Sequence, residues 1–200
     1  MDWMELIRGR RSVRAFRPEA LTRAQIETVL EAARWAPSPH GRQPWRFAVV
    51  TTPAAKARLS AAMGAEWRRQ LALDGQDEAT IAARFRKSHE RIVGAPAVIV
   101  PCLYLADLDA YPDPERQAAE TTMAVQSLGC AVQNMLLAAY AQGFAGGWMC
   151  APLFCQGAVR AALGLADTLA PHALIPLGYA AQEPVRRARR PLDELVVAWE

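Results

Sequence analysis

The sequence lacks any long apolar run. None of its hydrophobic stretches approaches the roughly 18 residues that a membrane-spanning helix needs. The opening residues, Met1 to Ile7, include acids and lack the basic and apolar regions of a signal peptide. We therefore expect a cytoplasmic protein with no membrane partner. At 200 residues, 52% of them hydrophobic, the chain is long enough to form one well-packed domain over residues 1–200.

Cysteine and histidine are also scarce. The four cysteines form no C-x-x-C pair and have apolar neighbours, which favours buried thiols over disulfides or a zinc site. The three histidines are far apart in the sequence, so no metal site is expected. These residues are Cys102, Cys130, Cys150, Cys155, His40, His89 and His172.

Lysine is nearly missing, since the 23 basic residues comprise 21 arginines and only Lys56 and Lys87. A general preference for arginine codons explains this bias, so the net charge of +3 does not indicate a nucleic-acid partner, and none is expected. Individual arginines remain informative, because a guanidinium group can hold a phosphate through two hydrogen bonds.

Sequence motifs of several enzyme classes are missing as well. Gly143, Gly146 and Gly147 lack the spacing of a dinucleotide-binding G-x-G-x-x-G motif, and there is no P-loop motif. No G-x-S-x-G motif of a serine hydrolase occurs either. The sequence thus gives no support to these three classes.

Hydrophobic periodicity predicts helices separated by a few strands. A capping box at Thr22 and Gln25 predicts the start of one helix, which ends before Pro37. The other helices are predicted over 2–9, 54–72, 77–92, 116–141 and 154–163, and strands over 45–50, 97–102, 146–149 and 173–177. This pattern favours an α+β or mixed α/β fold with a small sheet. Because the helix over 116–141 is apolar nearly all the way round, we expect a homodimer; a central helix within a monomer is the alternative.

A cluster of arginines surrounds Ser12. In the stretch Arg10-Arg11-Ser12-Val13-Arg14, cations and a hydroxyl group follow a short helix and could bind a dianionic phosphate. In an extended segment Ser12 and Arg14 would lie on one face. The alternative is a solvated basic turn.

Two further segments carry polar groups. A proline-rich loop presents Ser38, His40 and Gln43 on a stiff backbone, which suits the edge of a planar ligand, although an ordinary turn is an alternative. The tail contains Arg186-Arg187-Ala188-Arg189-Arg190, which either meets an anion or forms a solvated surface run.

Taken together and in this order, these segments resemble the nitroreductase superfamily of FMN-dependent oxidoreductases. The resemblance also includes Gln133–Ala139, Leu177-Gly178-Tyr179 and Arg190-Pro191-Leu192, and it extends over essentially the whole chain. It implies a three-layer α+β sandwich, in which helices flank a small, mostly antiparallel sheet, and an intertwined homodimer.

The resemblance implies roles for particular residues. The arginine–serine cluster and the basic tail would bind FMN, Pro37 and Ser38 would reach it from the partner subunit, and backbone groups at Cys150 and Ala151 would lie near the reactive ring edge. The implied FMN-binding residues are Arg10, Arg11, Ser12, Arg14, Pro37, Ser38, Gln43, Cys150, Ala151, Arg187 and Arg189.

One position departs from the pattern of the superfamily. Gly41 replaces the usual asparagine, and Arg42 follows it. We expect His40 and Arg42 at the substrate cavity. Together with Arg46 and the helical segment near 64–92, they favour a large or anionic substrate.

The implied reaction is ping-pong electron transfer from NAD(P)H through FMN to an organic acceptor such as a nitroaromatic compound or a quinone. No catalytic acid, base or nucleophile is then required, because the flavin carries the chemistry. Three alternatives remain. One is a reductase of the dehydro precursor of the deazaflavin coenzyme, suggested by Ala36–His40 with Arg46-Phe47. The others are a flavin-binding protein without turnover and an oxygen-dependent flavin-fragmenting or dehalogenating enzyme.

Overall fold

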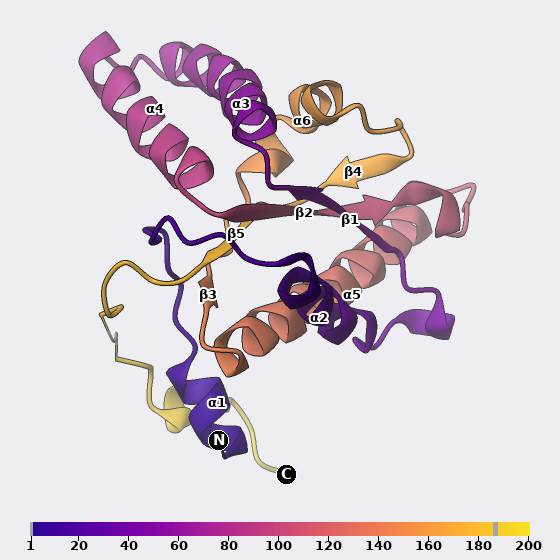
Figure 1. The fold of residues 1–200 in the computed structure, drawn as a ribbon. Coiled ribbons are helices and arrows are strands. Elements are labelled where there is room, and N and C mark those ends of the chain that lie inside the picture. Colours follow the sequence, from indigo (N-terminus) through magenta and orange to yellow (C-terminus); the bar gives the residue numbers. More distant parts are fainter. Residues whose placement is uncertain (1, 186–187) are drawn as a thin grey trace.

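The computed structural model describes residues 2–185 and 188–200. The regular elements of these residues alternate between helices and short strands (Figure 1). The helices are α1 (Trp3–Gly9), α2 (Arg23–Arg34), α3 (Pro53–Leu73), α4 (Glu78–Val93), α5 (Pro114–Ala141) and α6 (Gln156–Leu163). The strands are β1 (Trp45–Val50), β2 (Ala97–Tyr104), β3 (Ala145–Gly146), β4 (Leu169–Pro171) and β5 (Ile175–Gly178).

The strands form one small antiparallel sheet in the order β1-β2-β5-β3, with β4 also paired to β2. Helices α2 and α5 cover one face of the sheet, and α3, α4 and α6 cover the other (Figure 1). Strand β2 shows why: Ile99 and Leu103 pack in the core with α2 and α5, whereas Val98 and Val100 pack in the core with α3, α4 and α6. A strand buried on both faces is apolar throughout. The predicted three-layer α+β sandwich is therefore confirmed.

The chain between α1 and α2 runs along the edge of the sheet. Ser12 pairs with Gly146 of β3 in parallel, and Phe16 pairs with Ala180 in an antiparallel bridge. The amide of Val13 donates to the carbonyl of Gly146 at 3.0 Å. The predicted extended segment is thus confirmed, and the sheet edge fixes its position.

Most predicted boundaries are correct to within a few residues. Thr22 caps α2 and exchanges hydrogen bonds with Gln25, as the capping box predicts. Strand β4 is missing from the sequence-based expectation, because three residues ending in Pro171 are too short to show an alternating pattern.

The prediction of buried thiols is correct for Cys102, whose burial raises the pKa of the thiol to about 12. It is wrong in the single chain for Cys130 and Cys150, which are exposed, and for Cys155, which is half-buried. The prediction relied on the apolar residues next to each cysteine in the sequence. Cys130 has such neighbours, but it is not among the buried residues of α5.

Helix α5 buries one long face and leaves Met123 and Val125 37% exposed. A single copy of the chain therefore does not cover all of the apolar surface of this helix. None of the helices within residues 2–185 and 188–200 combines the length and the apolar character needed to span a bilayer.

Candidate active site

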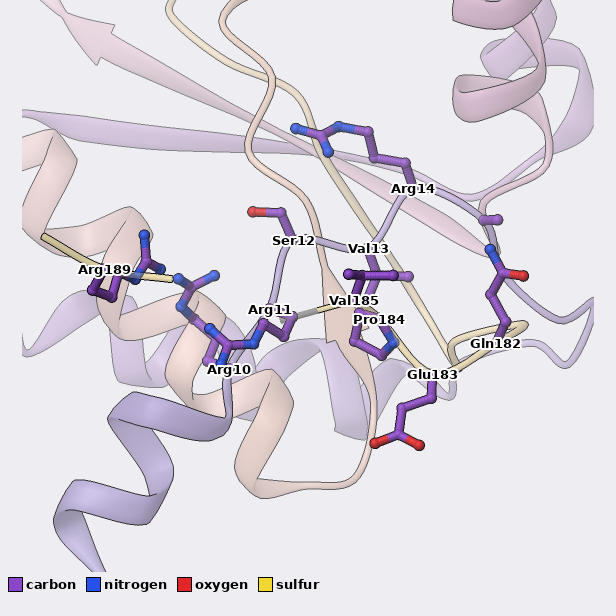
Figure 2. A pocket seen from close by; sticks show the side chains of 11 residues that line it. Arg10, Arg11, Ser12, Val13, Arg14, Gln182, Glu183, Pro184, Val185 and Arg189 are labelled. Carbon is purple, nitrogen blue, oxygen red and sulfur yellow. The ribbon is translucent and has the colours of Figure 1, made fainter. Parts of the chain in front are cut away.

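A cavity of about 460 Å³ opens beside the extended segment that follows α1 (Figure 2). We call it the arginine cavity. It is lined by Arg10, Arg11, Ser12, Val13, Arg14, Ala15, Gln182, Glu183, Pro184, Val185 and Arg189. The two ends of the described chain thus meet at one site, as Figure 1 also shows for α1 and the C-terminal tail.

The arginine cavity concentrates positive charge. Figure 2 shows the guanidinium groups of Arg10, Arg11 and Arg189 close together at one end, while the side chain of Glu183 extends away from them. Burial, and next the charges of Arg189 and Arg11, lower the pKa of the Arg10 guanidinium. Among the described residues, no carboxylate forms an ion pair with any of the three.

Two buried nitrogens in this cluster lack an acceptor. The Nε atoms of Arg10 and Arg11 are buried and have no hydrogen-bond partner among the described residues. A buried donor without an acceptor costs free energy, roughly 1–3 kcal/mol. A bound anion with several oxygens, such as a phosphate, would supply acceptors and neutralise the repulsion between the cations.

Ser12 and Arg14 lie on the open side of the segment. Val13 is buried, whereas Ser12 and Arg14 are exposed, and Figure 2 shows these two side chains extending toward the same side. The predicted shared face of Ser12 and Arg14 is thus confirmed. Gly147 permits the segment to lie this close to the sheet, since a Cβ atom there would come within 2.5 Å of the Val13 carbonyl oxygen.

A second cavity of about 560 Å³ adjoins the first at Arg14, which lines both. We call it the aromatic cavity. It is lined by Arg14, Met63, Gly64, Trp67, Gln70, Leu71, Asp74, Arg84, Lys87, Ser88, Arg91, Trp148, Met149, Ala151, Phe154 and Cys155. Sequence reasoning singled out the segment near 64–92 but missed these cavity residues within it. The spacing of Arg84, Lys87, Ser88 and Arg91, which places them on one helical face, is the pattern that could have revealed them.

Ala151 lines the aromatic cavity, and Cys150, which precedes it in the chain, is exposed. The backbone N–H groups of these two residues take part in none of the hydrogen bonds among the described residues. They are therefore able to donate to a ligand. Arg187, the other predicted member of the basic tail, lies outside the described residues.

The proline-rich loop lies away from both cavities in the single chain. Pro37 is exposed, and the Ser38 hydroxyl accepts a hydrogen bond from the amide of Gln43 at 3.0 Å. His40 and Gln43 have φ values of 56° and 51°, which few residues other than glycine adopt. Gly41 also has a positive φ, 66°, which glycine and asparagine both tolerate, and this explains a glycine where asparagine is usual.

The structure surrounds the two arginines of this loop region with acids. Arg42 contacts Asp109 at 2.6 Å and the buried Glu120 at 3.4 Å. Arg46 contacts Asp107 at 3.1 Å and lies over the ring of Tyr104. The guanidinium of Arg42 lowers the pKa of the Asp109 carboxyl through a hydrogen bond and its charge. Both cations are thus largely neutralised within the chain, and a role for Arg42 or His40 in substrate binding stays a prediction.

Comparison with known proteins gives a consistent result. A sequence profile described as "Nitroreductase family" matches residues 7–179. The chain is 28% identical to "Putative NAD(P)H nitroreductase YfhC" of Bacillus subtilis, over 95% of this chain and 90% of that protein. It is 32% identical to "Putative NAD(P)H nitroreductase YdjA" of Escherichia coli, over 82% and 80% of the two chains.

Solved structures show the same fold. A protein from Desulfovibrio desulfuricans, described as a putative nitroreductase in complex with FMN, has a TM-score of 0.75 and 28% identity, covering 98% of this chain and 96% of that chain. A BluB-like flavoprotein from Clostridium difficile has a TM-score of 0.81 and 20% identity, covering all of both chains, and this likeness concerns the fold alone. Because the family profile spans most of the sequence and the architecture agrees, this chain belongs to the nitroreductase family.

Proposed function

We propose that this chain passes electrons from a reduced nicotinamide to an organic acceptor by a ping-pong reaction at a bound FMN. Membership in the family makes the chain an FMN-dependent oxidoreductase. The observation that carries the finer proposal is the convergence of Arg10, Arg11 and Arg189, with two buried Nε atoms that lack an acceptor, next to the aromatic cavity.

The residues present fit FMN at both ends. The arginine cluster offers charge and donors to a phosphate, and Ser12 adds a hydroxyl group. Arg14 lies where the two cavities meet, so a ligand with a phosphate in the arginine cavity could extend past it toward the aromatic cavity. The free N–H groups at Cys150 and Ala151 lie at the aromatic end.

FMN, when bound, supplies the redox chemistry by accepting and donating electrons through its ring system. The protein contributes position and charge. Arg14 places a positive charge at the junction of the cavities, where it would stabilise negative charge that develops on a bound ring. Met149 and Trp148 supply apolar and aromatic surface against which a planar ring can pack.

An acceptor screen with the purified, FMN-loaded protein tests this function. We expect steady oxidation of NADH or NADPH, without air, in the presence of a quinone, a nitroaromatic compound or the dehydro precursor of the deazaflavin coenzyme. A flavin-loaded protein that oxidises neither nicotinamide with any acceptor would instead be a flavin-binding protein without turnover. Reaction only in air, with loss of the flavin absorbance, would identify an oxygen-dependent flavin-fragmenting enzyme.

We propose further that the protein is a homodimer in which α5 contacts the partner. Met123 and Val125, on opposite flanks of the buried face of α5, are each 37% exposed, and the C-terminal tail exposes Val197 and Trp199 almost fully. Burial of such apolar surface favours association. In this dimer Pro37 and Ser38, which lie away from both cavities of their own chain, would reach the site of the partner.

A Met123→Glu substitution tests the dimer. The wild type is expected to have twice the chain mass of 21.9 kDa in light scattering. The variant is expected to shift toward monomer and to lose FMN, because a charge replaces an apolar contact and the partner loop is withdrawn. An Ala161→Glu control on the exposed surface of α6 should stay dimeric. A wild-type protein of monomer mass would contradict the proposal.

A further inference from the structure

The exposed end of the aromatic cavity carries a row of cations that the proposed FMN phosphate site does not use. Arg84, Lys87 and Arg91 of α4 all line the cavity, at spacings of three and four residues. Side chains at such spacings share one face of a helix. Lys87 and Arg91 also line an adjoining cavity of about 480 Å³ that reaches Gln182, so the row continues toward the arginine cavity.

Among the described residues, no side chain forms an ion pair or a hydrogen bond with the side chains of these three cations, in contrast to Arg42 and Arg46. Asp74 is the only carboxylate among the described residues that line the aromatic cavity, and Glu90 lines the adjoining one. Burial and the nearby charge of Arg14 lower the pKa of the Arg91 guanidinium. Like charges on one helical face destabilise a helix. A bound anion would therefore reduce the repulsion between these three cations.

Much of the remaining lining of the cavity is apolar or aromatic. Met63, Trp67 and Leu71 of α3 line it together with Trp148 and Phe154. Such a wall suits a planar ring, by stacking and by burial of apolar surface. Because α3 and α4 form adjacent helices joined by a short turn, they hold the apolar wall and the cationic row together.

We propose that the cationic row of α4 (Arg84, Lys87 and Arg91) binds the anionic group of a ring-bearing substrate, a carboxylate or a phosphate, whose ring occupies the aromatic cavity. This inference rests on the proposed function, because the ligand is then the electron acceptor or the nicotinamide donor itself. The acceptor would present a carboxylate or phosphate, and NADPH would present its 2′-phosphate.

The test compares substrates that differ only in charge. An Arg84→Gln, Lys87→Gln double variant of the FMN-loaded protein is assayed with 4-nitrobenzoate against 4-nitrobenzamide, and with NADPH against NADH. We expect KM for at least one anionic member of these pairs to rise about tenfold, with little change for its neutral or less charged counterpart. An increase with 4-nitrobenzoate places the acceptor at the row, and an increase with NADPH places the donor there.

An Arg86→Gln variant is the matched control, since Arg86 is an exposed cation of α4 that lines neither cavity. It should leave all four KM values unchanged. If the double variant has normal flavin absorbance and the wild-type KM values for both substrate pairs, the inference is overturned. The proposed function would then remain intact.

Calorimetric titration of the FMN-loaded protein gives a readout that needs no turnover. Wild-type protein should bind 4-nitrobenzoate more tightly than 4-nitrobenzamide, or NADP+ more tightly than NAD+, and the double variant should lose that preference. The oxidised nicotinamides are used here because they cannot reduce the flavin. If this result occurs without any turnover, the inference stands and the proposed function fails. Equal Kd values within both pairs for the wild type would contradict the inference.

Discussion

An Arg10→Ala, Ser12→Ala double variant is expected to purify without flavin colour. Arg10 is one of three cations that converge in the arginine cavity, and Ser12 presents a hydroxyl group beside them. Hydrogen bonds to charged groups contribute about 1.5–3 kcal/mol each. Loss of two such contacts should weaken FMN binding by at least about a hundredfold.

The FMN content of the purified protein and the Kd from titration of FMN into the apoprotein measure this effect. An Arg34→Ala, Thr28→Ala variant removes an exposed arginine and a hydroxyl from α2 and should remain yellow. Unchanged melting temperature of the apoprotein would show that the cluster acts on the ligand. A double variant that stays yellow with unchanged FMN content would refute the phosphate site.

A Gly147→Ala substitution is expected to destabilise the protein and to lower its flavin content together. The added Cβ atom would lie 2.5 Å from the Val13 carbonyl oxygen, and this backbone atom cannot rotate away. The segment that carries Ser12 and Arg14 must then move off the sheet edge. Overpacking of this kind costs about 1–3 kcal/mol, which lowers Tm by roughly 2–4 °C per kcal/mol for a chain of this size.

A Gly157→Ala variant gives the matched control, because no atom lies within 4 Å of a Cβ atom at that position of α6. Gly157 lies in the first turn of α6, where the gain from alanine is small, so this variant should keep about the wild-type stability and its flavin. If the Gly147 variant melts at the wild-type temperature and keeps full flavin content, close packing at this glycine does not position the site.

Local features of the sequence predicted much of the fold. The capping box at Thr22 gave the start of α2, and the unbroken apolar run at 97–102 indicated the strand β2, which the structure buries on both faces. The extended segment at Ser12 also agrees with expectation. Each of these features depends on residues that are neighbours in the sequence. A local pattern of residue types is therefore enough to predict it.

The site was predictable where a short motif contained it and unpredictable where packing assembled it. The cluster around Ser12 was visible as five consecutive residues. The aromatic cavity was not, because Trp67, Arg91 and Trp148 come from three distant segments that meet only when the helices pack on the sheet. Arg42 shows the opposite error: a cation that looked available in the sequence meets Asp109 and Glu120 from a distant turn and helix.

Anaerobic titration of the FMN-loaded wild-type protein with NADH and NADPH, followed by addition of a quinone, is the most direct test of the proposed site and function. One equivalent of at least one nicotinamide should bleach the flavin absorbance, and the quinone should restore it. Flavin absorbance that persists with excess NADH and NADPH would contradict an FMN-dependent transfer of electrons from a nicotinamide by this chain.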